Sequence, residues 1–563
     1  MRKCLGLCLL LLLFVLVTVF VNPLRETPID DDWAYGLTVR HLLNTGEYRL
    51  HDWSAANMPA QVYWAAFLAR TFGYSFSVLR CSTLILLLVG LIAFYQLLRD
   101  FGVGDIEASL LTFALLCSPV LFFLSFTFQT DVQFLGWQIL ALWLYSRALR
   151  RRSYSYMALA SLAAFAAVGT RQFGAALVGG LVLTWFIFEQ RCLRKVPLYL
   201  VGLTLPLLMT SWQFSFGVNR PTFSQKVRLA EQVAYMRDLP HLLGDFFWRP
   251  TVILQYTGLF LLSVVPVLAL IVRSRWKTPV PASLPGSARV SHSSLWLLCF
   301  WVMYLIVAIC FGYFFYLPHV LMPYLAWLLP NAQTSPFGFK KHLALTLVTF
   351  GFAIIFGWLL SSRYLTKRNW QLLSCAEWFV VLSGLTLFGM QLLYAQFYDV
   401  YLIQFLPFAV FALGRMAPAW PGWCKAITAV LCLFMLSISA LWTRGALAEA
   451  EASWRAAELA HSVGAAPSDV GGNMTWSCYH GAFDEWITRI GGFDASEHYI
   501  GSHRMHFAFF DFLNQRFDHA KYLVTSASPN TLPQNAQLLG AVPFRDGCLR
   551  ARSIHVVVRP TLD

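Results

Sequence analysis

Long apolar stretches separated by short polar ones dominate the chain. Because about 20 apolar residues are needed to carry a helix across a bilayer, stretches near this length predict spans. The first stretch, residues 5–21, follows Met1-Arg2-Lys3 without an Ala-x-Ala cleavage site, so we interpret it as a retained helix. The later predicted spans lie near 83–98, 108–126, 132–147, 197–216, 251–272, 295–316, 343–361, 371–393, 401–414 and 425–443.

Three segments depart from this simple pattern. Residues 154–188 are too long for one span and predict two short helices that meet at 169–174 (Gly-Thr-Arg-Gln-Phe-Gly). Residues 218–250 are polar enough to leave the membrane, and apolar residues at helical spacing predict a helix on the interface. Residues 317–330 are apolar but short and contain three prolines, so we favour a re-entrant segment over a span.

Basic residues between the spans predict the orientation of the bundle. Clusters of Arg and Lys lie at 147–152, 191–195, 273–289 and 363–368. Loops rich in these residues stay in the cytoplasm. The N-terminus and these loops are therefore expected inside, and the loop after residue 21 is expected on the outer face.

The composition changes near residue 445. Residues 446–463 predict an amphipathic helix, and 522–525 and 554–558 predict strands between Gly, Asn and Pro turns. We therefore expect residues 1–444 to form an all-α polytopic membrane bundle of about 11–13 transmembrane helices. Residues 445–563 are expected to form a small soluble α/β domain on the outer face.

The composition supports this class. The chain is 58% apolar and only 12% charged, with a mean hydropathy of +0.58, which excludes a soluble globular protein. Its net charge of +14 lies mostly between apolar stretches, so we expect no nucleic-acid partner. The 12 cysteines show no metal spacing, and pairing of Cys478 with Cys548 is left open.

The strongest candidate for chemistry is Asp30-Asp31-Asp32-Trp33-Ala34-Tyr35, just after the first apolar stretch. Carboxylates at a membrane surface are costly to desolvate and have no packing use there. They can act as a general base or bind a cation. The alternative is a solvated loop that ends a helix.

Other charged and aromatic residues fall on the same predicted face. Asp131 opens the fourth span, Arg171 lies between the two short helices, and Arg80 precedes the second span. Residues 394–401 (Tyr-Ala-Gln-Phe-Tyr-Asp-Val-Tyr) open a late span there. Each has a structural alternative, since arginines can anchor a helix at the interface and aspartates can cap helices. Their common placement predicts a site.

The spacing of these residues resembles that of a known family. The spacing Asp31-Asp32-x-x-Tyr35 resembles the Asp-Glu-x-x-Tyr in the first external loop of lipid-linked-sugar glycosyltransferases of the GT-C fold. That group includes protein O-mannosyltransferases and the aminoarabinose transferases that modify lipid A. The further similar elements are Gly46-Glu47-Tyr48, Pro59, Tyr63-Trp64, Gly73, Leu79-Arg80, Asp131, Tyr398-Asp399-Val400-Tyr401-Leu402 and Leu406-Pro407.

Two departures from the family pattern concern phosphate binding. Many relatives have Lys-Pro-Pro before the Tyr-Trp pair, but here the stretch is Asn57-Met58-Pro59-Ala60. Val400 stands where an arginine is usual. Both changes remove a cation that can meet a lipid phosphate, and we assign that task to Arg171 and Arg80 instead.

The resemblance implies a membrane glycosyltransferase that moves a sugar from a polyprenyl-phosphate donor to a hydroxyl acceptor. The acceptor is a lipid, a glycan or a protein, and the place is the outer face of the bacterial cytoplasmic membrane. We expect the C-terminal domain to cover the site or bind the acceptor. The implied catalytic residues are Asp31, Asp32 and Asp131, with Asp31 the best base, the phosphate-binding residues are Arg171 and Arg80, and the substrate-binding residues are Tyr35, Tyr63, Tyr398, Asp399 and Tyr401.

We expect no cofactor and no metal ion. A divalent cation beside Asp30, Asp31 and Asp32 is an alternative that we do not favour, because no histidine joins these carboxylates. The alternative function is a polytopic transporter or flippase of a lipid-linked or anionic substrate. Transporters usually show internal repeats, and this chain shows none.

Overall fold

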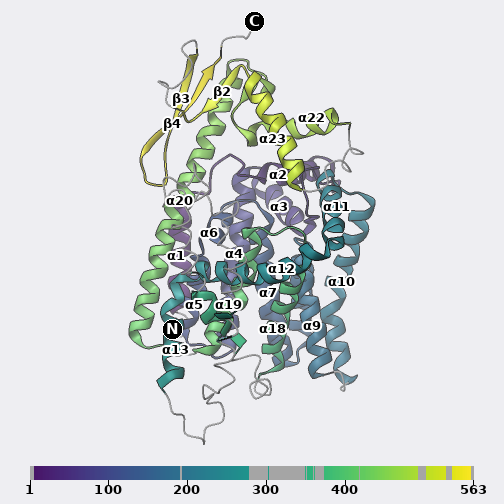
Figure 1. The fold of residues 1–563 in the computed structure, drawn as a ribbon, viewed down its shortest axis with the longest axis vertical. Coiled ribbons are helices and arrows are strands. Elements are labelled where there is room, and N and C mark those ends of the chain that lie inside the picture. The colour runs from purple at the N-terminus through teal and green to yellow at the C-terminus, as the bar shows by residue number, and fades with distance from the viewer. Residues whose placement is uncertain are drawn as a thin grey trace, which may run out of the picture.

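The computed structural model describes residues 5–189, 193–277, 373–417, 419–491, 502–527 and 536–559, with short pieces at 299, 302–303, 349, 351–358 and 360–361. These residues form a tall bundle of helices with a small sheet at one end (Figure 1). The predicted fold class is confirmed. The predicted span near 295–316 and the predicted re-entrant segment at 317–330 lie outside the described residues, apart from positions 299 and 302–303.

The helices of the bundle, in chain order, are α1 Leu5–Val21, α2 Asp32–Thr45, α3 Pro59–Phe72, α4 Phe76–Asp100, α5 Asp105–Leu116, α6 Pro119–Ser125, α7 Thr130–Arg151, α8 Tyr154–Val168, α9 Ala175–Phe188, α10 Val196–Asn219, α11 Phe223–Arg237, α12 Leu239–Phe260, α13 Val265–Lys277, α18 Cys375–Leu393 and α19 Leu406–Met416. The C-terminal part adds α20 Gly422–Ser462, α21 Met474–Tyr479, α22 Ala482–Arg489, α23 Ser502–His519, β1 Val470–Gly471, β2 Tyr522–Thr525, β3 Gln537–Arg545 and β4 Ala551–Val558.

Within the described residues, four helices are long and apolar enough to cross a membrane, and six spans result if two bent pairs each count once. The four are α4, α10, α18 and α20, which agrees with the predicted spans 83–98, 197–216, 371–393 and 425–443. The predicted spans 108–126 and 251–272 are instead bent, by 73° and 70°. Pro119 follows the first break directly, and a proline cannot supply the amide that a continuous helix needs.

The predicted split of residues 154–188 is confirmed. Helix α8 ends at Val168, a short 3-10 helix spans Gln172–Gly174, and α9 follows. A Cβ on Gly174 would lie 2.4 Å from the amide nitrogen of Val168, so only glycine allows this tight connection. The turn presents Arg171 at the end of the bundle that carries the sheet.

Helix α20 corrects the expected division of the chain. Sequence patterns predicted a span at 425–443 and a separate helix at 446–463, whereas one helix of 41 residues covers both. Gly445 lies inside this helix, at a point where the backbone of Gly547 approaches too closely to leave room for a Cβ. The expected boundary between residues 444 and 445 therefore falls inside a continuous helix.

The C-terminal sheet has the strand order β1-β2-β4-β3. Strand β1 is parallel to β2, while β4 runs antiparallel to both β2 and β3. The predicted strands at 522–525 and 554–558 are confirmed, but β3 was missed. It contains Gly540 and Pro543, which are typical of turns, and it tolerates them because it is an edge strand with a bulge between Leu538 and Gly540.

The C-terminal part is packed on the bundle along two surfaces. Helix α20 lies against β3 and β4, with Ala456 and Ala457 buried there. On the other side, α21, α22 and α23 share one hydrophobic cluster with α2 and the loop after it. Trp53 of that loop meets Phe483 of α22 edge-on at 5.0 Å and Phe509 of α23 at 5.7 Å. The domain is therefore held over the loops that carry the candidate residues.

Candidate active site

Arg80 organises the loop between α1 and α2. Its side chain is fully buried, and its guanidinium donates to the carbonyl oxygens of Pro23 at 2.7 Å, Arg25 at 3.0 Å and Thr27 at 2.9 Å. These bonds satisfy backbone acceptors that the loop would otherwise bury unpaired. Arg80 does not line the cavity described below, so the geometry gives no support to its predicted phosphate-binding role.

Asp32 also has a structural task. Its Oδ1 accepts the amide of Phe128 at 2.7 Å and its Oδ2 accepts the amide of Ile29 at 3.2 Å. The carboxylate thereby ties the start of α2 to the segment that leads into α7. Burial raises the pKa of Asp32 to about 7, with the Arg80 charge opposing the rise. Asp32 lies outside the cavity, so its predicted catalytic role finds no support in this geometry.

The three consecutive carboxylates point in different directions. Asp30 has a left-handed backbone with φ of 51°, and its Oδ2 accepts the side-chain amide of Gln129 at 2.7 Å. Asp31 accepts the indole N–H of Trp53 on Oδ1 at 2.7 Å. Among the described residues, no group of three or more His, Cys, Asp or Glu side chains is arranged to hold a metal ion.

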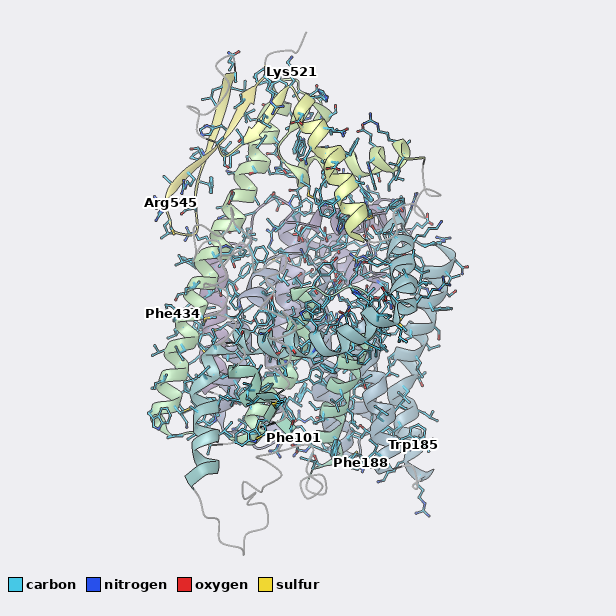
Figure 2. All side chains as sticks on the ribbon, viewed as in Figure 1. Phe101, Trp185, Phe188, Phe434, Lys521 and Arg545 are labelled. Atoms are coloured by element: carbon cyan, nitrogen blue, oxygen red, sulfur yellow. The ribbon has the colours of Figure 1, made fainter. Side chains whose placement is uncertain are left out.

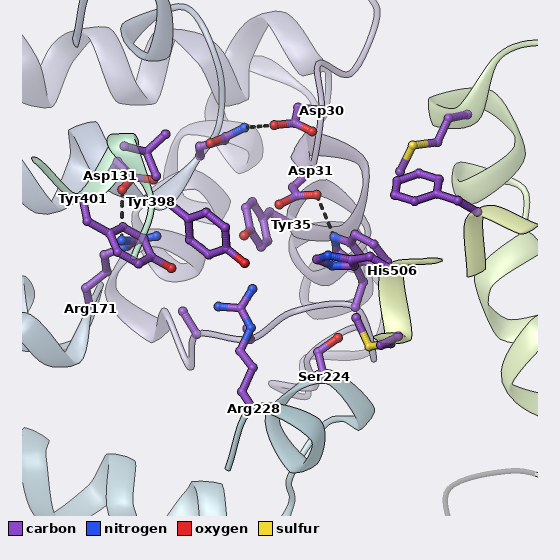
Figure 3. Close-up of a pocket in the computed structure, with 18 of the residues that line it drawn as sticks. Asp30, Asp31, Tyr35, Asp131, Arg171, Ser224, Arg228, Tyr398, Tyr401 and His506 are labelled. Carbon is purple, nitrogen blue, oxygen red and sulfur yellow. Dashed lines mark hydrogen bonds and ion pairs between the residues drawn. The ribbon is translucent and has the colours of Figure 1, made fainter. Parts of the chain in front are cut away.

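A cavity of about 480 Å³ lies where the bundle meets the C-terminal domain (Figure 3). Five of the predicted residues besides Asp31 line it, namely Tyr35, Asp131, Arg171, Tyr398 and Tyr401. Its full lining is Asp30, Asp31, Tyr35, Trp53, Ala55, Ala56, Gln129, Asp131, Arg171, Ser224, Arg228, Tyr398, Val400, Tyr401, Met474, Met505, His506, Phe507 and Phe510. Residues that are distant in the sequence thus line one cavity, as we predicted from their placement on one face of the bundle.

Asp31 is the carboxylate best placed for chemistry in this cavity. The Trp53 indole fixes one of its oxygens, and this is the one hydrogen bond of its side chain within the described residues. Burial raises the pKa of Asp31 to about 7, and the adjacent charge of Asp30 adds to the rise. A carboxylate with a pKa near the working pH can both accept and release a proton.

Asp131 and Arg171 form an ion pair at one side of the cavity. Their Oδ1 and Nη1 atoms are 2.9 Å apart, and Asp131 is almost fully buried. Arg171 also donates from Nε to the Thr130 hydroxyl at 2.7 Å, and its guanidinium lies 4.7 Å from the ring centroid of Tyr401. Much of the charge of Arg171 is therefore balanced by the protein itself.

Arg228 is the functional candidate that sequence reasoning left out of the site. It projects from α11 into the cavity, towards Tyr398 and Asp31 (Figure 3). No hydrogen bond or ion pair to another described residue holds its guanidinium, and its buried Nε has no partner there. Ser224 and Arg228 both line the cavity, and they are four residues apart in the sequence. Residues at this spacing share one face of a helix, which is the pattern that could have indicated Arg228.

Hydrogen bonds hold helix α11 to the loop after α2 and to the end of α18. At its start, Thr222 and Gln225 form a capping box, and the Thr222 hydroxyl donates to the carbonyl of Ser54 at 2.6 Å. Further along, Gln232 accepts the amide of Ala395 and donates to the carbonyl of Leu393, both at 2.8 Å. The segment before Tyr398 and the helix that carries Arg228 are therefore locked together.

The remaining predicted residues have other surroundings. Tyr63 is exposed on α3 and stacks on Tyr48 at 5.8 Å, away from the cavity lining. Asp399 begins a short 3-10 helix, but its side chain lies outside the described part of the structure. Asn57, where many relatives have lysine, donates to the carbonyl of Gln213 at 3.1 Å. That asparagine fastens a loop instead of supplying a cation.

The C-terminal domain completes the cavity. Met474 from α21 and Met505, His506, Phe507 and Phe510 from α23 line its outer side. The His506 ring lies 5.3 Å from that of Trp53, so the cover is in contact with the loop that holds Asp31. The cavity therefore has a charged floor formed by the bundle and a largely apolar cover formed by the domain.

A helical membrane bundle with carboxylates, arginines and tyrosines at one end of it defines the class, a polytopic membrane enzyme. Residues 57–214 match the family described as dolichyl-phosphate-mannose-protein mannosyltransferase. This match includes Arg80, Asp131 and Arg171. It agrees with the predicted resemblance to lipid-linked-sugar glycosyltransferases, and it does not favour the alternative of a transporter or flippase.

Two solved structures resemble the chain at low identity. ArnT from Cupriavidus metallidurans bound to undecaprenyl phosphate is 13% identical, with 99% of each chain covered and a TM-score of 0.40. The oligosaccharyltransferase AglB from Archaeoglobus fulgidus, in complex with an inhibitory peptide and a dolichol-phosphate, is 14% identical, with 82% of this chain and 58% of that chain covered and a TM-score of 0.43. No curated protein sequence matches the chain.

The contrast between Asp31 and Asp32 predicts opposite effects of the same substitution. In Asp32→Asn, one of the two buried amides loses its acceptor, which should lower the free energy of unfolding by about 1–3 kcal/mol. Asp31→Asn keeps an oxygen for Trp53 and removes a buried charge, so its stability should be unchanged or higher. Thermal unfolding in detergent measures the difference in stability between the two variants. Equal unfolding midpoints would contradict the assignment of a structural role to Asp32 and not to Asp31.

Proposed function

We propose that this glycosyltransferase uses the 480 Å³ cavity as its active site, with Asp31 as the general base and Arg228 as the main contact of the donor phosphate. One observation carries the proposal. A carboxylate with a raised pKa and a cation without a protein partner among the described residues face the same cavity, and Arg228 is close enough to oppose the rise in the pKa of Asp31. Such a pair fits an acid–base step beside a developing negative charge.

The reaction that fits this geometry is a direct displacement. The hydroxyl oxygen of the acceptor forms a bond to the anomeric carbon of the sugar, and Asp31 takes the hydroxyl proton. The bond between that carbon and the phosphate oxygen breaks, and the lipid phosphate leaves with the electron pair. Attack from the face opposite the leaving group inverts the anomeric carbon. Arg228 stabilises the phosphate, and Asp131 keeps Arg171 oriented beside it.

The donor in this proposal is a hexose or pentose on a polyprenyl phosphate. Tyr35, Tyr398 and Tyr401 supply ring faces and hydroxyl groups around the space between the charges, which suits a sugar that is polar at its edges. The acceptor, a lipid, a glycan or a protein, enters past Phe507 and Phe510 of the cover, both of which are exposed. No metal ion or other cofactor takes part in the proposed step.

We also propose an orientation in the cytoplasmic membrane of a bacterium. The basic run 147–152 ends α7, and Arg150 lies 5.2 Å from the ring centroid of Phe101. Phe101, Trp185 and Phe188 lie at the end of the molecule opposite Lys521 and Arg545 of the sheet (Figure 2). Since basic loops favour the cytoplasm, the cavity and the C-terminal domain should lie outside.

The orientation predicts the behaviour of reporters fused after Asp563. Alkaline phosphatase, which folds only outside the cytoplasm, should be active, and a fluorescent protein that folds only in the cytoplasm should be dark. The same two reporters fused after Arg152, at the opposite end of the bundle, should give the reverse pattern. Fluorescence from the C-terminal fusion would place the cavity inside and contradict the orientation.

The role of Asp31 predicts both a loss of activity and a pH dependence. Asp31→Asn should abolish transfer, because the amide that replaces the carboxylate cannot take the hydroxyl proton. In the natural protein the rate should rise about tenfold per pH unit up to about 7 and then level off, since the base must be deprotonated. Asp30→Asn removes a charge that raises the pKa of Asp31, so its midpoint should move to lower pH. Near-normal transfer by Asp31→Asn, or an unmoved midpoint, would refute this assignment.

The role of Arg228 predicts a donor-specific defect. Arg228→Ala should lower kcat/KM for the lipid-linked donor by roughly 100-fold, and Arg228→Lys should recover part of it as a charge without the planar fork. Arg220→Ala is the matched control, because Arg220 is exposed and pairs with Glu47 at 3.0 Å outside the cavity. If both alanine variants lose the same activity, Arg228 has no special contact with the phosphate.

A further inference from the structure

A second cavity, of about 210 Å³, lies between the loop after α1, helix α20 and strand β3. Its lining includes Arg25, Arg444, Arg455 and Arg545, together with the single carboxylate of Glu451. It shares no residue with the larger cavity, and the proposed transfer reaction does not use it. Four positive charges against one negative charge in so small a space require an explanation.

The internal pairing in this cavity is incomplete. Glu451 pairs with Arg25 and, at 2.7 Å, with Arg455. Arg444 and Arg545 have no ion pair with another described residue, and the guanidinium of Arg444 lies 4.7 Å from the ring centroid of Phe20. Asp546, next to Arg545 in the chain, is engaged by Arg552 at 3.3 Å. Two guanidinium groups are therefore left for an anion from outside the protein.

The position of the cavity indicates the source of that anion. Exposed apolar side chains cover α1 and the loop beyond it up to Leu24, and they cover α20 at Val430 and Phe434, with exposures of 67%, 64% and 60%. Such surfaces on a membrane bundle face acyl chains. Phe434 of α20 and Arg545, the last residue of β3, lie on the same side of the molecule (Figure 2). Because Phe20 contacts Arg444, the arginines begin where the apolar surface ends, at the level of lipid head groups.

We propose that this basic cavity binds the phosphate of an anionic phospholipid from the leaflet on the side of the C-terminal domain. Arginine recognises phosphate through two parallel hydrogen bonds, and Arg444 and Arg545 approach from different elements. The acyl chains of the lipid would lie along the apolar side chains near Phe20 and Leu24. Because Arg444 belongs to α20 and Arg545 to β3, the bound lipid ties the sheet to the bundle at the membrane surface.

Lipid binding by the full-length protein tests this proposal. Purified protein in detergent is titrated with phosphatidylglycerol and, separately, with zwitterionic phosphatidylethanolamine, and bound lipid is counted by native mass spectrometry. Phosphatidylglycerol should bind more tightly, and the double variant Arg444→Gln/Arg545→Gln should weaken it at least tenfold. Arg70→Gln, which removes an exposed arginine at the end of α3, should leave the affinity unchanged.

A single variant and a competition experiment complete the test. The single variant Arg545→Gln changes only an exposed strand residue, so it should fold and still weaken phosphatidylglycerol binding. Inorganic phosphate should compete poorly, because it lacks the acyl chains that the apolar surface would hold. Undiminished phosphatidylglycerol binding by both variants would overturn the proposal, as would competition by phosphate at concentrations similar to the lipid.

Discussion

The structure depends on the pairing of charge at the edge of a low-dielectric bundle. A buried charge without a partner costs several kcal/mol, so each charged group near the first loop needs hydrogen bonds or an opposite charge. Arg80 finds three carbonyl oxygens, Asp32 finds two amides, and Asp131 finds Arg171. The exceptions identify the site. Arg228 has no hydrogen-bond or ion-pair partner within the described residues, and Asp31, which accepts one hydrogen bond from Trp53, faces the same cavity.

The same pairing explains why the cavity belongs to both parts of the protein. The charged floor comes from the first loop, α7, α11 and the segment around Tyr398, which hydrogen bonds hold in place. The cover comes from α21 and α23, which rest on Trp53 through aromatic contacts. The apolar cover lowers the polarity around the charged floor, and electrostatic interactions are stronger where the surroundings are less polar. Because α20 continues without a break from the bundle into the domain, it couples their positions.

Much of the fold and part of the site could be predicted from the sequence. Hydrophobic length predicted the long spans, and the common outer face of Asp31, Asp131, Arg171 and Tyr401 was enough to predict that they meet. Length cannot show where a helix bends or continues, so the bends near Pro119 and Pro266 and the unbroken passage through Gly445 needed the tertiary structure. Strand β3 was missed for the same reason, since Pro543 is tolerated only because its strand lies at an edge.

Some roles could not be predicted because residues of the same type have different partners in the structure. Arg80 and Arg228 are both arginines at the end of the bundle near the C-terminal domain, but carbonyl oxygens surround the first and a cavity lies beside the second. Asp31 and Asp32 are adjacent and acidic, yet one faces the cavity and the other caps backbone amides. A sequence motif identifies the type of side chain, whereas its orientation follows from contacts that are distant in the chain.

The position of a bound lipid phosphate is the most direct test of this account. A cryo-electron microscopy map of the full-length protein with a polyprenyl phosphate would show whether the phosphate enters the larger cavity. We expect phosphate density within about 4 Å of the Arg228 guanidinium, the distance of an ion pair, with Arg171 beside it and Asp31 across the remaining space. Density for the phosphate outside that cavity, with Arg228 left unoccupied, would contradict it.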